Sequence, residues 1–454
     1  MTDINVQQAC RRLGYRAWYS LTGRIKFVNE LERSQWLPSG ELEELQLKKL
    51  KKLLEHTYYH IQYYRSTLEA IGYKPGDEVT LEQFRKLPVL TKRDIQDNLV
   101  HLRDTKVKSK PNHTGGSTGF PLTFYQDRNY WNHNFGDKIR TYRMCSYEVG
   151  DRVVFLWGSD YDSRQHKGVL PRLFDRLFRN MIWINTFDIT EQTLYQKTLE
   201  IAKFKPKIII GYTSSLFMLA NLVREKGIAG IRPQGIQSSA EILTADIRET
   251  IESTFNCKVF DRYGCREMGN VAHECSEHSG LHILAENNLV EFLSDTGETV
   301  EAGEQGNIVV TNLNNYAMPL IRYQVDDIGV PTDNRCLCGR GLPLMEVVKG
   351  RSSDAIQSPS GKVLHGEFFT HLFYNIEGVR QFQVVQETIE LLRIRIVPAG
   401  NFSTESLDYL RDVIHKHADE SFTIEFDICQ EIETSSSGKY RFTISNIPHR
   451  LANN

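Results

Sequence analysis

The stretch PKIIIGYTSSLFMLANLVREKGIAGIRPQGIQSSAE, residues 206–241, contains two short apolar runs that are separated by a segment of helix length. The same alternation surrounds it, with the apolar runs RVVFLW at 152–157, NMIWINTF at 180–187 and KVFDRYG at 258–264. Continuous apolar strands of this kind are buried on both faces of a sheet, and helices connect them in parallel order. The sequence therefore predicts a layered α/β domain with a largely parallel sheet.

The segment before this domain, residues 1–105, is expected to be a helical lead-in. Its clearest signal is an apolar stripe at helical spacing, formed by Leu45, Leu47, Leu50, Leu53 and Leu54. Lysines lie between these leucines, and we expect them to form the solvated face of the helix. Contact of this basic face with a membrane or a partner is the alternative.

The segments after the parallel strands change in character. From Asn288 the runs NLVEFL, GNIVVTNL and PLIRY are nearer to the pattern of an antiparallel β subdomain. The polar stretch at 347–362 then reads as a linker. Beyond it the sequence predicts a small α+β unit from a helix, a strand pair, a second helix and a final strand, at GEFFTHLFYNIEG, QFQVV with LLRIRIV, ESLDYLRDVIHKHADE and FTIEFDICQEI. We expect a large N-terminal domain, residues 1–350, and a small mobile C-terminal domain, residues 351–454.

Composition narrows the class of protein. The chain has 454 residues and a formal net charge of −2 at pH 7, which argues against a dedicated nucleic-acid binder. No signal peptide and no apolar run of membrane-spanning length are evident, so a cytoplasmic location is expected. The 8 cysteines are too few for a disulfide scaffold in a chain of this length.

A run of small residues, Thr114-Gly115-Gly116-Ser117-Thr118-Gly119, lies between the predicted lead-in and the α/β domain. Glycine and small hydroxyl residues are unfavourable within helices and strands, so the run predicts a loop. Backbone N–H groups and hydroxyls without bulky side chains suit close approach to a phosphate chain. An ordinary tight turn is the alternative for this run taken alone.

This loop is one of a series of motifs that follow one another in a fixed order along nearly the whole chain. They are LLEHTYYHIQYYR, LPVLTKRDI, TGGSTGFP, SSAEILT, DRYGCREMG, PLIRYQVDDIG, CLCGRGLP, KGRSSDAI and SGKYRFTIS. The ordered set resembles the adenylate-forming superfamily, and is most similar to its phenylacetate–CoA ligase branch, which includes the CapK-like proteins of capsule biosynthesis. The resemblance implies a two-step enzyme. ATP, Mg²⁺ and a carboxylic acid give an acyl adenylate and pyrophosphate, and a second nucleophile then takes the acyl group.

The resemblance also implies nucleotide-binding residues in the large domain. Tyr263 has the place of the aromatic residue that stacks on adenine, next to Gly264, and Glu267 has the place of a Mg²⁺-associated carboxylate. Asp327 aligns with the aspartate that accepts from the ribose hydroxyls, although its neighbour Asp326 is a second candidate. The three residues that border adenine and the acyl group in relatives correspond to Ser239, Ala240 and Glu241.

Further implied residues lie at the domain junction and in the tail. Arg351 matches an arginine that reaches ribose or phosphate oxygens, and Asp354 lies at the expected swivel. Lys439, in the last motif, is expected to neutralise charge at the α-phosphate during adenylation. Phe120 and Gln324 stand where relatives often carry basic residues, and Asp326 stands where they usually carry glycine, so a non-catalytic scaffold with the same fold stays an alternative.

Cysteine and histidine residues form a second group of candidate site residues. HECSEHSGLH contains Cys275, His278 and His282, and CLC supplies Cys336 and Cys338. A Cys-x-Cys pair combined with Cys and His from another segment is a suitable tetrahedral zinc set, and phenylacetate–CoA ligase relatives with such segments suggest a metal clamp. We expect structural zinc at Cys275, His282, Cys336 and Cys338, with His278 as the rival to His282.

The acyl acceptor is CoA by resemblance, while CapK-like proteins make an amine or a sugar the alternative. Trp157 and Tyr212 are candidates to line an aryl pocket, although core packing is the more common role of such residues. Neither the carboxylic acid nor the oligomeric state follows from the sequence, and a homodimer is one possibility.

Overall fold

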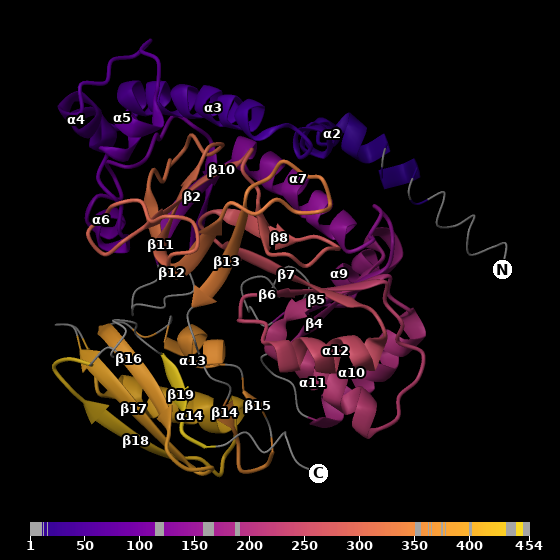
Figure 1. The fold of residues 1–454 in the computed structure, drawn as a ribbon. Helices are drawn as coiled ribbons and strands as arrows, with labels where there is room; N and C mark the ends of the chain where they lie inside the picture. Colours follow the sequence, from indigo (N-terminus) through magenta and orange to yellow (C-terminus); the bar gives the residue numbers. More distant parts are fainter. Residues whose placement is uncertain are drawn as a thin grey trace.

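The computed structural model describes residues 11, 13–15, 17–113, 122–157, 168–186, 191–349, 356–361, 363–364, 366–373, 376, 378–398, 402–432 and 442–447. Most of the strands in these residues belong to one 11-stranded sheet, with the order β10-β11-β12-β13-β9-β8-β7-β6-β5-β3-β4. Figure 1 shows this twisted sheet through the centre of the upper part of the molecule.

One half of the large sheet is parallel, as the apolar runs predict. Its strands are β3 (Val153–Trp157), β4 (Met181–Asn185), β5 (Ile208–Tyr212), β6 (Gly235–Ser239) and β7 (Lys258–Cys265). Helices connect these strands, namely α9 (Val169–Phe174) with the π-helical segment η1 (Asp175–Arg179), α10 (Glu191–Phe204), α11 (Thr213–Glu225) and α12 (Ala245–Phe255). Helices α10, α11 and α12 lie together along one face of the parallel strands (Figure 1), where apolar residues of both layers form a buried cluster.

The other half of the large sheet is antiparallel. Its strands are β8 (Gly269–Glu274), β9 (Leu281–Ile283), β10 (Asn288–Leu293), β11 (Gly306–Asn312), β12 (Tyr323–Thr332) and β13 (Leu344–Lys349). The expectation that PLIRY forms a strand is wrong for all but its last residue. Arg322 has a left-handed backbone with φ of 52°, and its guanidinium pairs with the buried Glu291 carboxylate at 3.0 Å, so the strand begins only at Tyr323.

A short hairpin precedes the long helix α7 (Arg128–Met144). Strands β1 (Ser109–His113) and β2 (Thr123–Asp127) pair antiparallel, from Ser109 opposite Asp127 to His113 opposite Thr123. The side chain of Asp127 accepts a hydrogen bond from the Tyr130 N–H, which caps the first turn of α7. The segment that connects the two strands, residues 114–121, lies outside the described residues.

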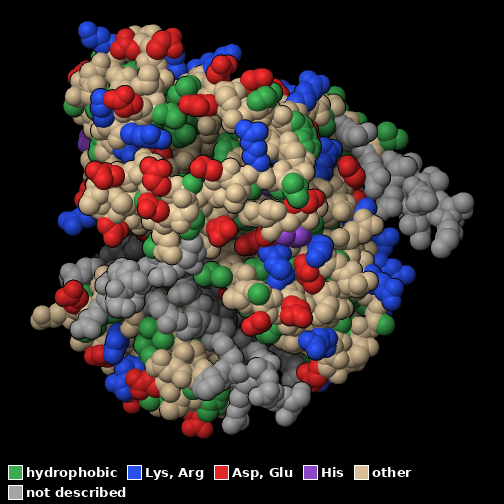
Figure 2. All heavy atoms as spheres, in the orientation of Figure 1, with side chains coloured by type: hydrophobic (Ala, Val, Ile, Leu, Met, Phe, Trp, Pro, Cys, Tyr) green, Lys and Arg blue, Asp and Glu red, His purple; other side chains and the backbone are tan. Residues whose placement is uncertain are grey.

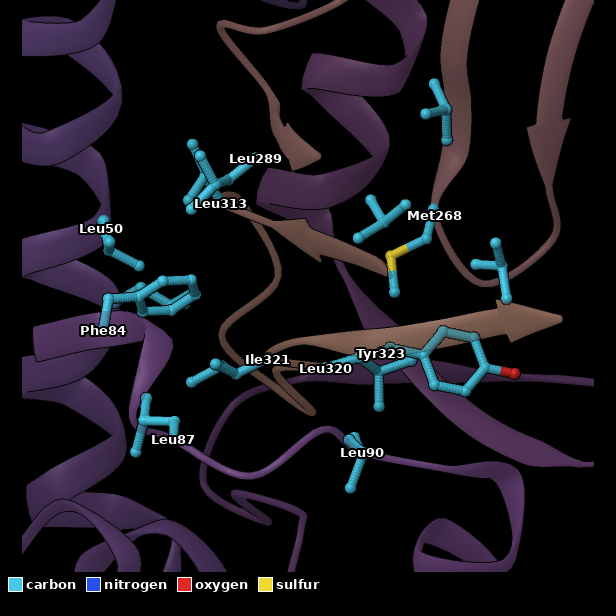
Figure 3. Packing of buried hydrophobic residues seen from close by; sticks show 14 of the residues in the cluster. Leu50, Phe84, Leu87, Leu90, Met268, Leu289, Leu313, Leu320, Ile321 and Tyr323 are labelled. Carbon is cyan, nitrogen blue, oxygen red and sulfur yellow. The ribbon is translucent and has the colours of Figure 1, made fainter. Parts of the chain in front are cut away.

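The described part of the N-terminal lead-in is mainly helical, as predicted. Its helices are α2 (Ile25–Ser34), α3 (Ser39–His60), α4 (Gln62–Ala70), α5 (Leu81–Arg85) and α6 (Lys92–Asp97). Leu50, Leu53 and Leu54 are at most 1 % exposed and join the cluster that packs the helices on the antiparallel strands. Figure 3 shows this packing, with Leu50 and Phe84 of the helices facing the chain around Leu313.

Charged groups also fasten the lead-in to the sheet. Lys49, whose stem lies beside the leucine stripe of α3, is an exception to the predicted solvated face, because its ammonium donates to the Glu286 carbonyl at 2.7 Å. The Glu286 carboxylate accepts from Ser34 at 2.7 Å and from Arg140 of α7 at 2.6 Å. Arg140 also pairs with Asp137 at 2.9 Å. Arg140 and Glu286 compensate each other's buried charge, so removal of either would leave a buried charge without its partner.

The C-terminal part forms a separate four-stranded sheet, β18-β17-β16-β19 (Figure 1). Its elements are β14 (Ile356–Gln357), β15 (Val363–Leu364), α13 (Gly366–Phe373), β16 (Val379–Gln386), β17 (Leu391–Pro398), α14 (Glu405–His417), β18 (Thr423–Ile428) and β19 (Thr443–Ser445). The run FTIEFDICQEI is therefore not the final strand, because β19 pairs in parallel with β16. The helices and strands enclose an apolar cluster of their own.

The predicted fold class is confirmed, with a layered α/β part, a β subdomain and a C-terminal α+β unit. Among the described residues, no helix is both long and apolar enough to cross a bilayer. Figure 2 shows acidic and basic side chains mixed over the visible face of the molecule, without a continuous basic stripe. This face has no electrostatic footprint of the kind that nucleic-acid binders present.

Candidate functional site

The carboxyl ends of the parallel strands bring predicted site residues into one row. Tyr212, Ser239 and Arg262 are opposite one another in the registers of β5 with β6 and of β6 with β7. Trp157, at the end of β3, contacts the Tyr212 ring with a centroid distance of 4.6 Å. Ligands of open α/β sheets bind at this end of the strands, which makes the row one wall of a candidate site.

Tyr263 and Asp327 meet across the sheet, 64 residues apart in sequence. The Tyr263 hydroxyl, on β7, donates to Asp327 Oδ2 on β12 at 2.8 Å. Asp326 is directed elsewhere, because its Oδ2 accepts from the Lys92 ammonium of α6 at 2.7 Å. A left-handed backbone at Asp326, with φ of 63°, separates the directions of the two neighbouring carboxylates. The structure therefore places Asp327, and not Asp326, beside the aromatic residue.

The Glu267 carboxylate is held in the turn between β7 and β8. Its Oε1 accepts from the Tyr323 hydroxyl at 2.9 Å, and the residue is only 6 % exposed. Gln126 of β2 donates to the main-chain carbonyls of Arg266 and Glu267, at 2.9 and 3.3 Å. Met268 and Tyr323 both belong to the large apolar cluster (Figure 3), so packing in this cluster holds the turn in place.

The segment Ser239-Ala240-Glu241 turns sharply at the end of β6. Ala240 has φ of 71°, a left-handed conformation that alanine rarely adopts. Glu241 accepts from the Ser214 main-chain N–H at 2.7 Å in the first turn of α11. A carboxylate is favourable at a helix N-terminus, and here it fixes the loop next to the row of strand ends.

Gly264 allows a close approach of the chain to itself. A Cβ atom built at this position would lie 2.1 Å from the Gly269 carbonyl oxygen, so any side chain would push β7 and β8 apart. The register shifts between Tyr263 and Gly264, which is where the strand leaves its regular pairing. The glycine thus permits the turn that carries Glu267.

Several predicted residues lie outside the described residues. These are Thr114, Gly115, Gly116, Ser117, Thr118, Gly119, Arg351, Asp354 and Lys439. Their roles stay predictions from the sequence.

Four predicted metal ligands come together between β8, β9 and the loop before β13. The ligand atoms of Cys275, His282, Cys336 and Cys338 all lie within 4.8 Å of one another. The Cys275 and Cys336 sulfurs are 3.5 Å apart, too far for a disulfide, and Cys338 Sγ is 3.5 Å from His282 Nε2. Ligand atoms around one tetrahedral Zn²⁺ are roughly 3.3–3.8 Å apart, as follows from the usual bond lengths. The donor set and its spacing therefore fit zinc.

His278 does not join this cluster. Its Nδ1 lies 3.2 Å from Glu274 Oε2 and 3.3 Å from an Arg248 terminal nitrogen. Burial lowers the pKa of His282 to about 4, so its imidazole is neutral and retains a lone pair for a metal. Of the two histidines left open by the sequence, the structure places His282 with the cysteines.

The cluster is tied to the N-terminal lead-in. Within the Cys336 loop, the Arg340 guanidinium lies 4.7 Å from the Trp36 ring centroid, and its Nε donates to Gln35 Oε1 at 2.8 Å. The Gly341 N–H donates to the Gln35 carbonyl at 2.9 Å. A Cβ at Gly341 would lie 1.7 Å from the Leu37 carbonyl oxygen, so only glycine fits this contact.

Sequence reasoning missed two residues of this region. The sequence pattern marks Tyr323, which holds Glu267, only as part of a strand, and it assigns no role to Arg262 within DRYGCREMG. Arg262 donates to Ser239 Oγ at 2.9 Å and to the Asn270 side chain. A charged residue directly before the motif tyrosine was the available signal, but its partners come from other strands.

Comparisons with known proteins agree with this geometry. A family model described as the CapK C-terminal domain matches residues 356–446. Protein CapK of Staphylococcus aureus is 24 % identical over 436 residues, which cover 90 % of each chain. Phenylacetate-coenzyme A ligases are also similar, at 25 % identity for the Thermus thermophilus protein, with 70 % of this chain and 72 % of that protein covered. The Pseudomonas putida ligase is 28 % identical, with 69 % and 72 % covered.

Among solved structures, 2-hydroxyisobutyryl-CoA ligase in complex with 2-HIB-AMP and CoA in the thioesterification state superposes with a TM-score of 0.64. The identity is 19 %, and 91 % of each chain is covered. The same ligase in the postadenylation state, in complex with 2-HIB-AMP, gives a TM-score of 0.61 at 18 % identity, with 91 % and 92 % covered. The chain is a homologue of CapK and of the phenylacetate–coenzyme A ligases, and it has the fold of the adenylate-forming coenzyme A ligases.

Proposed function

We propose that the protein is an AMP-forming ligase, which activates a carboxylic acid with ATP as an acyl adenylate and then transfers the acyl group to CoA. The observation that carries the proposal is the hydrogen bond between Tyr263 and Asp327, and the buried Glu267 carboxylate that Tyr323 holds in the turn after β7 adds to it. Homology to phenylacetate–coenzyme A ligases supports the reaction class.

The contacts suggest what each residue does. The Tyr263 ring would stack on adenine, while its hydroxyl holds Asp327 in place to accept from the ribose hydroxyls. The Glu267 carboxylate, which accepts from the Tyr323 hydroxyl, would help to hold Mg²⁺, and the ion would offset the negative charge of the ATP phosphates. The run Thr114–Gly119 would wrap the departing phosphates, and Arg351 would reach ribose or phosphate oxygens.

We further propose that residues 351–454 form a mobile domain that carries Lys439 to the α-phosphate for adenylation and withdraws it for acyl transfer. Asp354 would be the hinge. The separate C-terminal sheet and apolar cluster support a domain of its own, as does the match of residues 356–446 to the CapK C-terminal domain. The structural neighbour has been solved in postadenylation, thioesterification and open states, which supports such a motion.

A second candidate differs only in the acceptor. Similarity to CapK extends over 90 % of the chain, more than the 70 % covered by the T. thermophilus phenylacetate-coenzyme A ligase. This favours an amine or sugar acceptor as the alternative to CoA. The departures Phe120, Gln324 and Asp326 keep a non-catalytic scaffold as the remaining alternative.

ATP–pyrophosphate exchange over a panel of carboxylic acids tests the function. Exchange that depends on one class of acid is expected, and the product with CoA, with amines or with sugars then identifies the acceptor. No exchange with any acid, in protein that binds ATP, would support the scaffold.

The neighbouring aspartates offer a matched test of the nucleotide site. Asp327→Asn is expected to raise the KM for ATP by roughly 10-fold or more, because the ribose would lose hydrogen bonds to a charged acceptor. Asp326→Asn should change it little, since that carboxylate pairs with Lys92 at 2.7 Å. The rate of ATP–pyrophosphate exchange at varied ATP concentration gives the KM of both variants. An equal effect of the two substitutions would contradict the assignment of Asp327.

We also propose that Cys275, His282, Cys336 and Cys338 hold one structural Zn²⁺ ion. Four ligands in tetrahedral spacing leave no open position for a substrate, and the loop of Cys336 and Cys338 contacts the lead-in helices rather than the strand ends. The ion would thus fasten β9 and the Cys336 loop together and stabilise the surface on which Gln35 and Trp36 pack.

The purified protein is expected to contain about one zinc ion per chain. Cys336→Ser combined with Cys338→Ser should lose the metal and lower the melting temperature more than the turnover per folded molecule. Cys429→Ser, a cysteine on the C-terminal sheet, is the control and should change neither. Protein prepared without chelator that contains no metal by elemental analysis would refute the zinc site.

A cytoplasmic location and a homodimeric state stay predictions. Free cysteines throughout the described residues are compatible with a reducing compartment.

A further inference from the structure

Arg262 is an unusual residue for the place where it lies. Its side chain is only partly exposed, on β7, in register with Ser239 at the end of β6 and one strand further from Tyr212 at the end of β5. A guanidinium carries five N–H donors and a permanent charge. Contacts among the described residues use three of these donors, toward Ser239 Oγ, the Asn270 side-chain oxygen and the Gly269 carbonyl.

All three acceptors are neutral. None of the ion pairs found among the described residues includes Arg262, whereas Arg140, Arg248 and Arg322 each pair with a carboxylate. Burial lowers the pKa of the Arg262 guanidinium, which lies near the phenols of Tyr142, Tyr130 and Tyr212 and the Cys265 thiol. A charge taken from water into such surroundings costs several kcal/mol unless an opposite charge compensates it. The Asp261 carboxylate, on the preceding residue of β7, interacts with this charge without forming a salt bridge among the described residues, and an anionic ligand would supply a direct partner.

The direction of the side chain separates it from the nucleotide group. Tyr263, the next residue along β7, points to Asp327 and packs on the cluster of the antiparallel half. Successive side chains of a strand lie on opposite faces, and Arg262 accordingly lies on the other face, with Ser239. The aromatic pair Trp157 and Tyr212 continues the same row. Arg262 thus belongs to the wall that would surround the acid rather than the ATP phosphates.

We propose that Arg262 is a specificity residue that binds a second anionic group of the carboxylic acid, so that the substrate is a diacid or a phosphorylated acid rather than a simple monocarboxylic acid. This inference rests on the proposed acid-activating function. The two remaining N–H groups suit the two oxygens of a carboxylate or phosphate. The reacting carboxylate would lie toward Tyr263 and Glu267, and the second anion would lie toward Arg262.

Paired acids that differ in one charged group test the proposal. Suitable pairs are glutarate with pentanoate, 4-carboxyphenylacetate with 4-methylphenylacetate, and 3-phosphoglycerate with glycerate. Calorimetric titration measures acid binding to the full-length protein, and ATP–pyrophosphate exchange measures activation. The charged member of at least one pair is expected to bind more tightly, and the carboxylate and phosphate pairs identify the kind of anion.

Arg262→Gln should weaken binding of the charged acid by about 10- to 100-fold, because hydrogen bonds to charged groups are lost. It should leave binding of the partner acid without the second anionic group nearly unchanged, and Arg262→Lys should restore part of the preference. Arg248→Gln is the matched control, because it removes an arginine that pairs with Glu274 at 2.8 Å. Its acid preference should equal that of the wild type.

The two hypotheses fail in different ways. Acids without the second anionic group that bind as well as their partners that carry it, or an unchanged preference in Arg262→Gln, would overturn the role of Arg262 even if exchange proceeds with the simpler acids. Preferential binding of a charged acid that depends on Arg262 supports the role, and absence of exchange with that same acid would then count against the adenylation reaction alone.

Discussion

Lys439→Ala is expected to lower the rate of adenylation by roughly 10³-fold, because it removes a positive charge from the α-phosphate in the transition state. ATP should still bind, since the proposed contacts of Tyr263, Asp327 and Glu267 belong to the large sheet. ATP–pyrophosphate exchange measures the rate of adenylation, and an equilibrium titration measures the affinity for ATP.

The same variant separates the two half-reactions. Supplied with a chemically prepared acyl adenylate, Lys439→Ala should transfer the acyl group at nearly the wild-type rate, because the lysine is remote during that step. Lys416→Ala, a change in α14 of the same C-terminal unit, is the control and should affect neither step. Equal losses in both steps would mean that the lysine is structural or that the domain does not swing.

Valine at both Gly116 and Gly119 is expected to weaken ATP binding by roughly 100-fold or more. Each backbone hydrogen bond to a charged phosphate contributes about 1.5–3 kcal/mol, and branched side chains would keep the phosphates from these N–H groups. The fold should persist, because the flanking strands pair independently through Ser109–His113 and Thr123–Asp127. Titration with ATP and thermal melting measure the two effects.

Gly40→Val is the control for the glycine substitutions. A Cβ at Gly40 would contact nothing within 4 Å, and valine has a better helix propensity than glycine, so valine there should cost no stability. Wild-type ATP affinity in the Gly116 and Gly119 double variant would show that the run is an ordinary turn.

Local patterns predicted the elements whose signal is repeated over many residues. The apolar runs around Ile208–Tyr212 and Gly235–Ser239 became parallel strands, and the leucine stripe of α3 became buried. Boundaries with a tertiary cause were missed. Strand β12 begins late because Arg322 turns its backbone to reach Glu291, and the three-residue strand β19 exists only through its pairing with β16. A sequence window contains neither partner.

For the site, the sequence by itself determined which residue types are available and in what order. The ordered motifs pointed to adenylate formation, and the Cys-x-Cys pair with a third cysteine pointed to a metal. The sequence left open the choice between Asp326 and Asp327 and the choice between His278 and His282, because residues close in sequence share the same local pattern. Partners 64 and 56 residues away made the difference, when Tyr263 met Asp327 and His282 met Cys338.

Only the tertiary structure decided how charge is compensated. Arg140, Arg322 and Arg262 are alike in the sequence, but the first two lie against carboxylates from distant segments, and Arg262 lies against neutral oxygens and aromatic rings. The free energy of a buried charge depends on everything around it in space rather than on its neighbours along the chain. For that reason the sequence predicted the class of chemistry, while the fold placed Asp327 beside Tyr263, His282 among the cysteines and Arg262 among neutral acceptors.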